Sequence, residues 1–158
     1  MLFDDECYAE IGRVTVAATM IDFVVVELLR LMDPSQPGGH FGLMSLLTKR
    51  AGPLRDKTKE LLQANGEPNA LDALAWVQEA DAIITQRHRL VHAVWLTEGY
   101  GPERRIIGVH PQNAEEEFDG DLASLRAARE ALEEHGNKGL DVYSALRYGG
   151  HPGDNEDD

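Results

Sequence analysis

Four side chains that could do chemistry together lie within six residues of this chain. Arg87, His88, Arg89 and His92 fall at the end of a stretch with a strong apolar repeat. Histidine titrates near neutral pH and can move a proton, whereas arginine keeps its charge and can stabilise an anion. The segment therefore has the groups needed for acid–base chemistry on a negatively charged substrate.

Arg87 has an unusual position on the helix predicted for residues 69–93. At about 100° per residue, it lies at the centre of the apolar face. A guanidinium buried without a partner is costly, so we expect Arg87 to face an acid, a cluster of carbonyls or a solvated cleft. Asp22 and Glu27, on the first predicted helix, are candidate partners. The apolar residues around Arg87 are Ala80, Ile83, Ile84, Leu90, Val91 and Val94.

A row of polar side chains follows the margin of this face at spacings of four, three and four: Asp81, Thr85, His88 and His92. Side chains three or four residues apart are neighbours on a helix, so Asp81 could orient the histidines. His88, His92 and Asp81 also form a possible metal-binding set, but no Glu follows His88, so the metalloprotease pattern fails. We expect no metal at this site.

Length and composition favour a helical protein. The 158 residues suffice for one core, and Ala and Leu are abundant while aromatic residues make up 6%. This composition predicts the all-α class. We expect a four- to six-helix bundle, with a single domain over residues 1–148 and a disordered acidic tail over residues 149–158.

Apolar spacing and chain breakers predict the individual elements. A long first helix, two short helices and the long motif helix should precede a short extended or hairpin excursion over residues 94–109. Two further helices should follow, with Gly136 ending the first of them. The basic face of the third helix should be solvated. The six expected helices cover residues 5–32, 41–49, 54–64, 69–93, 121–135 and 140–148.

The charge balance is acidic, with a formal net charge of -13. This argues against a nucleic-acid partner, although residues 113–158 alone carry 13 acids and 4 basic residues. The single cysteine, Cys7, excludes an internal disulfide and fits a reducing compartment. The acidic amino end is unlike a signal peptide, and the longest apolar run is too short to span a bilayer. We expect a cytoplasmic protein with no membrane partner.

The segment from Arg87 to His92 resembles the signature of the HEPN (higher eukaryotes and prokaryotes nucleotide-binding) superfamily: Arg, a polar residue, three variable residues and His. The setting is also similar, because members are small helical bundles with this motif near the end of a long late helix. The resemblance covers residues 5–112. It implies cofactor-free, metal-independent RNA cleavage of the toxin or defence type, or RNA binding derived from it. The implied partners are RNA, a second copy across a shared cleft, and an antitoxin protein.

The resemblance also implies roles for individual residues. His92 would be the general acid or base, Arg87 would stabilise the charge on phosphorus, and His88 would orient His92 or contact phosphate. Members paired with nucleotidyltransferase antitoxins often carry Tyr two residues after the His, where this chain has Val94, so modification there is not expected. In the alternative, the chain is a non-catalytic helical dimer or interaction module in which Arg87 and His92 are structural. The expected RNA-binding residues are Arg89, Arg104 and Arg105, and the expected orienting residues are Asp22 and Asp81.

Overall fold

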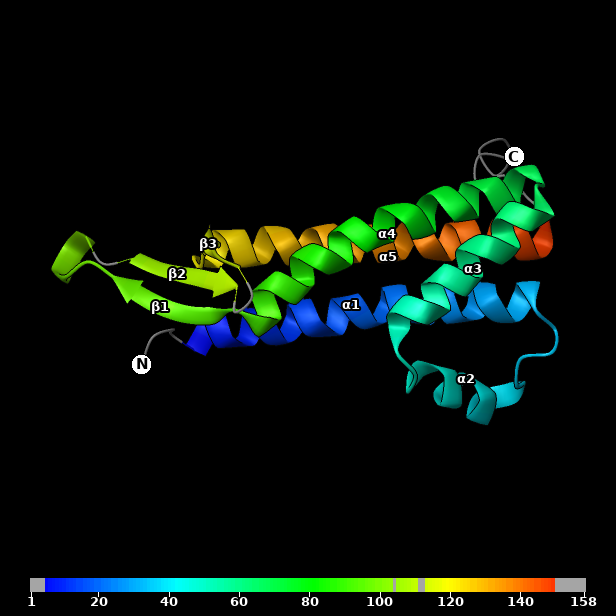
Figure 1. The fold of residues 1–158 in the computed structure, drawn as a ribbon, viewed down its shortest axis with the longest axis horizontal. Coiled ribbons are helices and arrows are strands. Elements are labelled where there is room, and N and C mark those ends of the chain that lie inside the picture. Colours follow the sequence, from blue (N-terminus) through cyan, green and yellow to red (C-terminus); the bar gives the residue numbers. More distant parts are fainter. Residues whose placement is uncertain (1–4, 104, 111–112, 150–158) are drawn as a thin grey trace, which may run out of the picture. The chain divides into compact units, whose positions relative to one another are not determined.

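The structure, a computed structural model, describes residues 5–103, 105–110 and 113–149 (Figure 1). These residues form long helices at both ends of the chain and a small sheet before the last helix, which confirms the predicted all-α bundle with a long first helix and an extended excursion after the motif helix. The helices are α1 (Asp5–Met32), α2 (Gly39–Leu47), α3 (Ala51–Asn65), α4 (Pro68–His92) and α5 (Leu122–Tyr148). The strands are β1 (Val94–Glu98), β2 (Arg105–His110) and β3 (Asn113–Asp119).

The chain divides into two compact units. The first unit comprises Met1–Ala18 and Ala82–Glu133, and the second comprises Thr19–Asp81 and Glu134–Asp158. Helices α1, α4 and α5 each contribute one part to each unit. The single domain expected over residues 1–148 stays a prediction. The expected acidic tail lies outside the described residues from residue 150 onward.

The apolar repeat of α1 explains why this helix forms. Val14, Ile21, Val25 and Leu28 recur at spacings of three to seven and are buried. Burying one such side chain contributes about 1.5–3 kcal/mol. The second half of the helix is buried on several sides, because apolar side chains that point in other directions are also buried: Val24, Val26 and Leu29.

The sheet of the first unit has the strand order β1-β2-β3, and both pairings are antiparallel. Strand β1 pairs with β2 from Val94 opposite Val109 to Glu98 opposite Arg105, which confirms the predicted hairpin. A short 3-10 turn at Gly101–Glu103 lies in the connection. Gly120 follows β3 and lies against Trp95, because a Cβ atom there would come within 2.6 Å of the ring.

A buried carboxylate ties α1 to α5 within the first unit. Glu10 is 1% exposed, and its carboxylate accepts hydrogen bonds from Arg129 and from Arg13, the latter at 2.6 Å. The hydrogen bond from Arg129 holds the pKa of the Glu10 carboxyl below its ordinary value, even though burial opposes this. Arg126 forms an ion pair with Glu6 on the same two helices. The charges of this region are therefore matched.

Trp76 and His135 join α4 to α5 in the interior of the second unit. The indole Nε1 of Trp76 donates a hydrogen bond to the His135 carbonyl at 2.9 Å, and His135 Nε2 lies 3.1 Å from the Trp76 carbonyl. The two rings stack with centroids 4.9 Å apart and planes 7° from parallel. Both side chains are buried. Two backbone carbonyls and two ring nitrogens are thus satisfied together.

The prediction that Gly136 ends a helix is wrong, because α5 continues from Leu122 to Tyr148. Gly136 and Gly139 instead allow close packing inside the second unit. A Cβ atom at Gly139 would lie 2.3 Å from Trp76 Cζ2, and one at Gly136 would lie 3.0 Å from Met20 Cγ. The packing of neighbouring side chains against these glycines therefore outweighs their poor helix propensity.

A second difference is strand β3. The sequence predicts an extended excursion over residues 94–109 followed by helices, but Asn113–Asp119 forms a further strand that pairs with β2. Pairing with the hairpin supplies backbone hydrogen bonds to this segment. The strand propensity of its own residues does not reveal such bonds, because they depend on a strand elsewhere in the chain.

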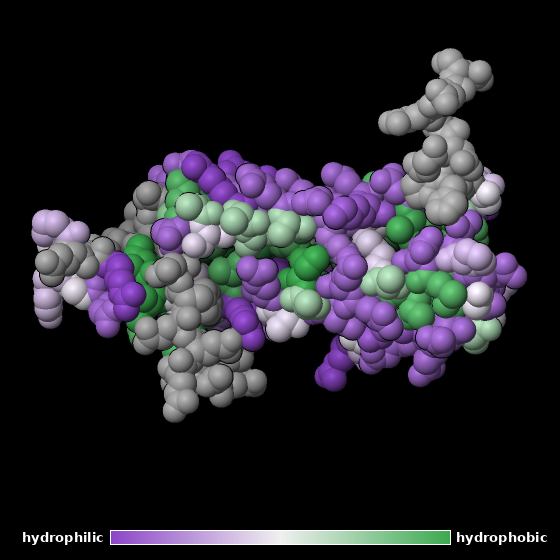
Figure 2. Space-filling model, turned by 90° about the horizontal axis from the view of Figure 1, so that it is seen from above, coloured by the Kyte–Doolittle hydropathy of each residue, from purple (hydrophilic) through white to green (hydrophobic). Residues whose placement is uncertain are grey.

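The outside of the molecule is largely hydrophilic, with separate hydrophobic areas on the face drawn in Figure 2. Within the described residues, every helix is too short or too polar to serve as a membrane span. Four large apolar side chains among the described residues are more than two-thirds exposed: Val16, Phe41, Tyr100 and Tyr148.

Candidate functional site

The end of α4 carries the predicted site and belongs to the first unit. The helix runs to His92, and Val94 then begins β1, so the histidines occupy the last two turns. Leu90 anchors these turns because it is 6% exposed. A cation near the carboxyl end of a helix also interacts favourably with the helix dipole.

Arg87 is half-buried on this helix. Its Nε atom is buried and has no hydrogen-bond partner among the described residues. A buried donor without a partner costs about 1–3 kcal/mol, so most proteins avoid such an atom. From its place on the apolar face, we expect Arg87 to have an acid, a cluster of carbonyls or a solvated cleft beside it. In the described part of the chain, no acid forms a hydrogen bond with its Nε.

His88 and His92 are both exposed, and their ring centroids lie 4.5 Å apart with planes inclined by 56°. Their spacing of one helical turn brings the rings side by side, as the sequence predicts. An imidazole can serve as a general acid or a general base, so this pair supplies candidate groups for proton transfer. The structure thus brings together two of the three predicted catalytic side chains, with Arg87 next to His88 in the sequence.

The predicted RNA-binding arginines differ in their surroundings. Arg89 is exposed on α4. Arg105 lies opposite Glu98 in the hairpin and pairs with its carboxylate at 2.5 Å, so a neighbouring acid offsets its charge. Arg104 lies outside the described residues.

The two predicted orienting acids belong to the second unit and contact basic side chains of α3. Asp81 accepts hydrogen bonds from Arg55 Nε and Lys59 Nζ, both at 2.8 Å. Asp22 Oδ1 lies 3.7 Å from Arg55 Nη1. Burial opposes ionisation of Asp81, but the bonds from Lys59 and Arg55 lower the pKa of its carboxyl. Glu27, the other candidate partner for Arg87, pairs with Arg30 at 2.6 Å.

Arg55 and Lys59 are therefore not the solvated face that the sequence suggested. The side chain of Arg55 is 14% exposed and that of Lys59 is 25% exposed. Sequence reasoning missed this cluster because Asp81 lies 22 and 26 residues from Lys59 and Arg55, and Asp22 is still farther from Arg55 in the sequence. One signal in the sequence could have indicated it. Basic residues follow one another at spacings of two and four on α3, and an acid lies within an otherwise apolar stretch of each of two other helices.

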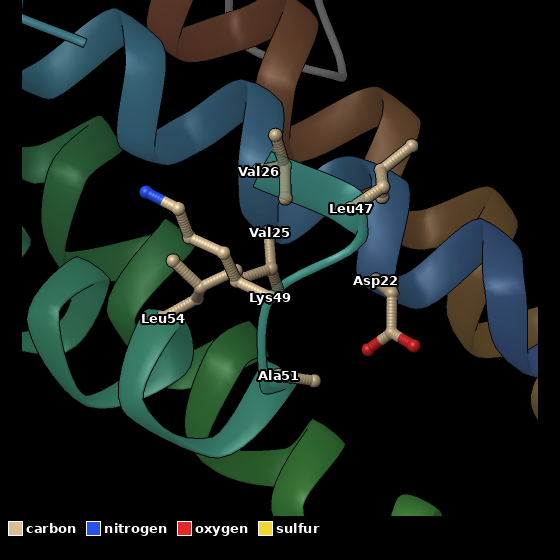
Figure 3. A pocket seen from close by; sticks show the side chains of 7 residues that line it. All are labelled: Asp22, Val25, Val26, Leu47, Lys49, Ala51 and Leu54. Atoms are coloured by element: carbon tan, nitrogen blue, oxygen red, sulfur yellow. The ribbon is translucent and has the colours of Figure 1, made fainter. Parts of the chain in front are cut away.

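Asp22 also lines a cavity of about 80 Å³ within the second unit. The cavity is formed by α1, the start of α3 and the segment before it, and its walls are mostly aliphatic (Figure 3). The Asp22 carboxylate and the Lys49 ammonium extend in different directions there (Figure 3). A space this small and apolar has no room for a nucleotide.

The alternative metal set of His88, His92 and Asp81 gains no support. Asp81 is already hydrogen-bonded by two cationic side chains. In the described ranges, no group of three or more His, Cys, Asp or Glu side chains is arranged to hold a metal ion.

Comparison of the chain with protein-family models, with curated proteins and with solved structures finds no match.

Proposed function

We propose that the chain is an HEPN-like, metal-independent RNA endonuclease of the toxin or defence type, which acts as a dimer. One observation carries the proposal: a half-buried arginine with an unsatisfied Nε directly precedes a pair of exposed, contacting histidines. A guanidinium with donors to spare suits a phosphate oxygen, because charge-assisted hydrogen bonds to phosphate are strong. The imidazole pair supplies the proton transfers.

The proposed reaction uses the 2′-hydroxyl of RNA as the nucleophile. His92 takes the proton of this hydroxyl while the oxygen attacks the adjacent phosphorus. The bond from phosphorus to the 5′ oxygen breaks, and protonated His88 gives a proton to that leaving oxygen. The products are a 2′,3′-cyclic phosphate and a 5′-hydroxyl. Arg87 stabilises the additional negative charge on the phosphoryl oxygens as it develops.

Local charge is compatible with RNA, despite the net charge of -13 for the whole chain. Residues 82–112 contain four arginines and two glutamates, a local balance of +2. An acidic run, Glu115–Glu117, follows directly in strand β3, which pairs with β2. A short positive stretch within an acidic chain would favour local phosphate contact while limiting non-specific binding of nucleic acid.

The test is cleavage of mixed RNA by the purified chain in EDTA. Loss of a general acid or base, or of an oxyanion donor, slows a reaction by about 100-fold or more, so Arg87→Ala and His92→Ala should abolish detectable cleavage. His40→Ala is the matched control, because His40 is exposed on α2 away from the motif sequence. The products should carry cyclic phosphate ends, and a substrate with 2′-deoxy sugars should resist cleavage.

Cleavage that survives both Arg87→Ala and His92→Ala would refute the proposal. So would an activity that EDTA abolishes and added divalent metal restores.

A second candidate function is a non-catalytic interaction module, favoured by the exposed face of β1. Val94 and Leu96 are 50% and 46% exposed, and alternate residues of a strand point to the same face. β1 is also an edge strand of the described sheet. An edge with apolar side chains is suited to pairing with another chain.

For this second function, a charge on β1 should disrupt association while RNA is unaffected by any variant. Leu96→Asp should convert a dimer to a monomer in sedimentation velocity, because burying an unpaired carboxylate is costly. Tyr100→Asp is the control, since Tyr100 is 95% exposed but lies outside β1. A monomeric wild type, or a Leu96→Asp variant that stays dimeric, would exclude the β1 interface.

A further inference from the structure

The second unit has an open pocket that the proposed nuclease site does not use. Its volume is about 310 Å³, and it is bordered by the end of α1, the following loop and the last turns of α5. These segments can be followed in Figure 1 from the cyan loop after α1 to the red end of α5. The volume is at the lower end of the range for small-molecule sites, about 300–1,000 Å³.

The pocket has a surplus of positive charge. Two arginines, Arg30 and Arg147, line it together with one acid, Glu27. Arg30 already pairs with Glu27 at 2.6 Å and donates to the Gly39 carbonyl at 3.2 Å. Among the described residues, Arg147 forms no direct ion pair with a carboxylate, so the lining side chains carry two positive charges and one negative charge.

Arg147 is held in place by neutral groups. Its Nη1 donates to the Tyr143 hydroxyl at 2.6 Å, and its guanidinium carbon lies 5.8 Å and 5.3 Å from the ring centroids of Tyr143 and Tyr148. Arg147 is exposed, and among the described residues only its Nη1 donates a hydrogen bond, so its other N–H groups can reach a ligand. An arginine that is already oriented loses less conformational freedom on binding than a mobile one.

The loop wall of the pocket is also organised before any ligand arrives. Asp33 accepts hydrogen bonds from the Ser35 amide at 3.1 Å, the Ser35 hydroxyl at 2.6 Å, Gln36 Nε2 at 2.6 Å and Lys57 Nζ at 2.9 Å. This network fixes the loop from α1 to α2. Two apolar residues also line the pocket: Leu31 at the end of α1 and Pro34 in this loop.

We infer that this pocket binds a small organic oxyanion. The anionic group, a phosphate or a carboxylate, accepts hydrogen bonds from the guanidinium of Arg147. The apolar part of the ligand lies against Leu31 and Pro34. Arginine binds both oxyanions through paired N–H donors, so the shared chemistry is a planar or tetrahedral oxyanion on a compact apolar body. The site is independent of the motif at the end of α4.

The experiment is a titration of the ¹⁵N-labelled full chain with phenyl phosphate and, separately, with benzoate, up to about 10 mM. Binding of either probe should shift backbone amide signals of residues 30–38 and 143–148. The stronger of the two probes identifies the oxyanion. Benzyl alcohol, which has the same ring size without the charge, should bind at least about fivefold more weakly, because it cannot form charge-assisted hydrogen bonds.

Two variants test the role of Arg147. Arg147→Gln should weaken binding by about fivefold or more, and Tyr143→Phe by about two- to threefold, since it removes the hydroxyl that orients the guanidinium. Arg126→Gln, on the same helix but outside the pocket, should bind as the wild type does. Thermal melting of each variant shows that it is folded.

Three results would overturn the inference. They are equal affinity in Arg147→Gln and wild type, equal affinity for benzyl alcohol and the anionic probes, and absence of localised shifts at the highest concentration. RNA cleavage is not part of this test, so the pocket and the nuclease can fail separately.

Discussion

Arginine and histidine meet opposite environments in two regions of this protein. In the second unit, Arg55 is mostly buried and contacts two aspartates, and His135 is 4% exposed and bonded to a backbone carbonyl. In the last two turns of α4, Arg87 has a buried Nε without a partner, and His92 is exposed beside His88. Arg55 is thus paired with acids, whereas the buried Nε of Arg87 has no hydrogen-bond partner among the described residues. His135 is buried, whereas His92 is exposed.

The difference separates a structural role from a chemical one. Buried polar groups that only stabilise a fold are expected to be fully hydrogen-bonded, because an unmade bond costs stability. A group kept unsatisfied lowers stability and is retained only if something else selects for it, such as a ligand. By this criterion we propose a structural role for Arg55, which pairs with two aspartates, and a functional role for Arg87.

A matched pair of substitutions tests the comparison with the largest expected effect. Arg55→Met removes a guanidinium that bridges Asp22 and Asp81, and should lower the free energy of unfolding by about 2 kcal/mol, less than for a fully buried pair because both acids are about two-fifths exposed. Arg87→Met keeps the apolar stem and removes the unsatisfied Nε. It should leave the free energy of unfolding unchanged or raise it by up to about 1 kcal/mol.

Urea unfolding followed by circular dichroism measures both values, with wild type and Arg89→Met as references. Arg89 is exposed on the same helix as Arg87, so its substitution should change stability by less than about 0.5 kcal/mol. The comparison fails if Arg87→Met destabilises the protein as much as Arg55→Met does. Arg87 would then be structural, as the interaction-module alternative requires.

Much of the fold could be predicted because it depends on local patterns. The repeat of Val14, Ile21, Val25 and Leu28 determines the extent of α1, and the breaks around residues 33–39 and 65–67 separate the helices that follow. Local reading failed at Gly136 and Gly139, where glycine commonly ends a helix but here accommodates Met20 and Trp76. It also failed at β3, which depends on pairing with a strand elsewhere in the chain. In both cases the deciding contact is distant in sequence.

The candidate site shows the same limit. The contact between His88 and His92 follows from helix periodicity alone, and the exceptional burial of Arg87 Nε follows from its place on the apolar face. The partners of Asp22 and Asp81 could not be predicted, because Arg55 lies on a third helix. Charge pairs between helices depend on which faces meet, and one sequence does not contain that information.

The second prediction concerns pH and has a smaller effect. Burial lowers the pKa of the His135 imidazole below its ordinary value of 6.5, despite the opposing influence of the Trp76 carbonyl and Glu79. A carbonyl can only accept, so Nε2 carries the proton of the neutral ring, and Nδ1 faces Glu79 at 4.0 Å. The other charged groups near this ring are Glu134 and Lys138.

Because the folded state resists protonation of His135, the unfolded state binds more protons just below pH 6.5. Stability should therefore fall as pH drops from 7 toward 5, by at most about 1.4 kcal/mol per pH unit. His135→Gln should flatten this slope, whereas His40→Gln, at an exposed position on α2, should keep it. The carboxylates whose pKa is lowered in the described part of the chain lose their contribution only at lower pH, below the ordinary values of 4.5 for Glu and 3.8 for Asp: Glu10, Asp33, Asp81 and Glu134. If the slope of unfolding free energy against pH were unchanged in His135→Gln, His135 would not be held neutral by its burial. Only the arginines would then distinguish the two regions.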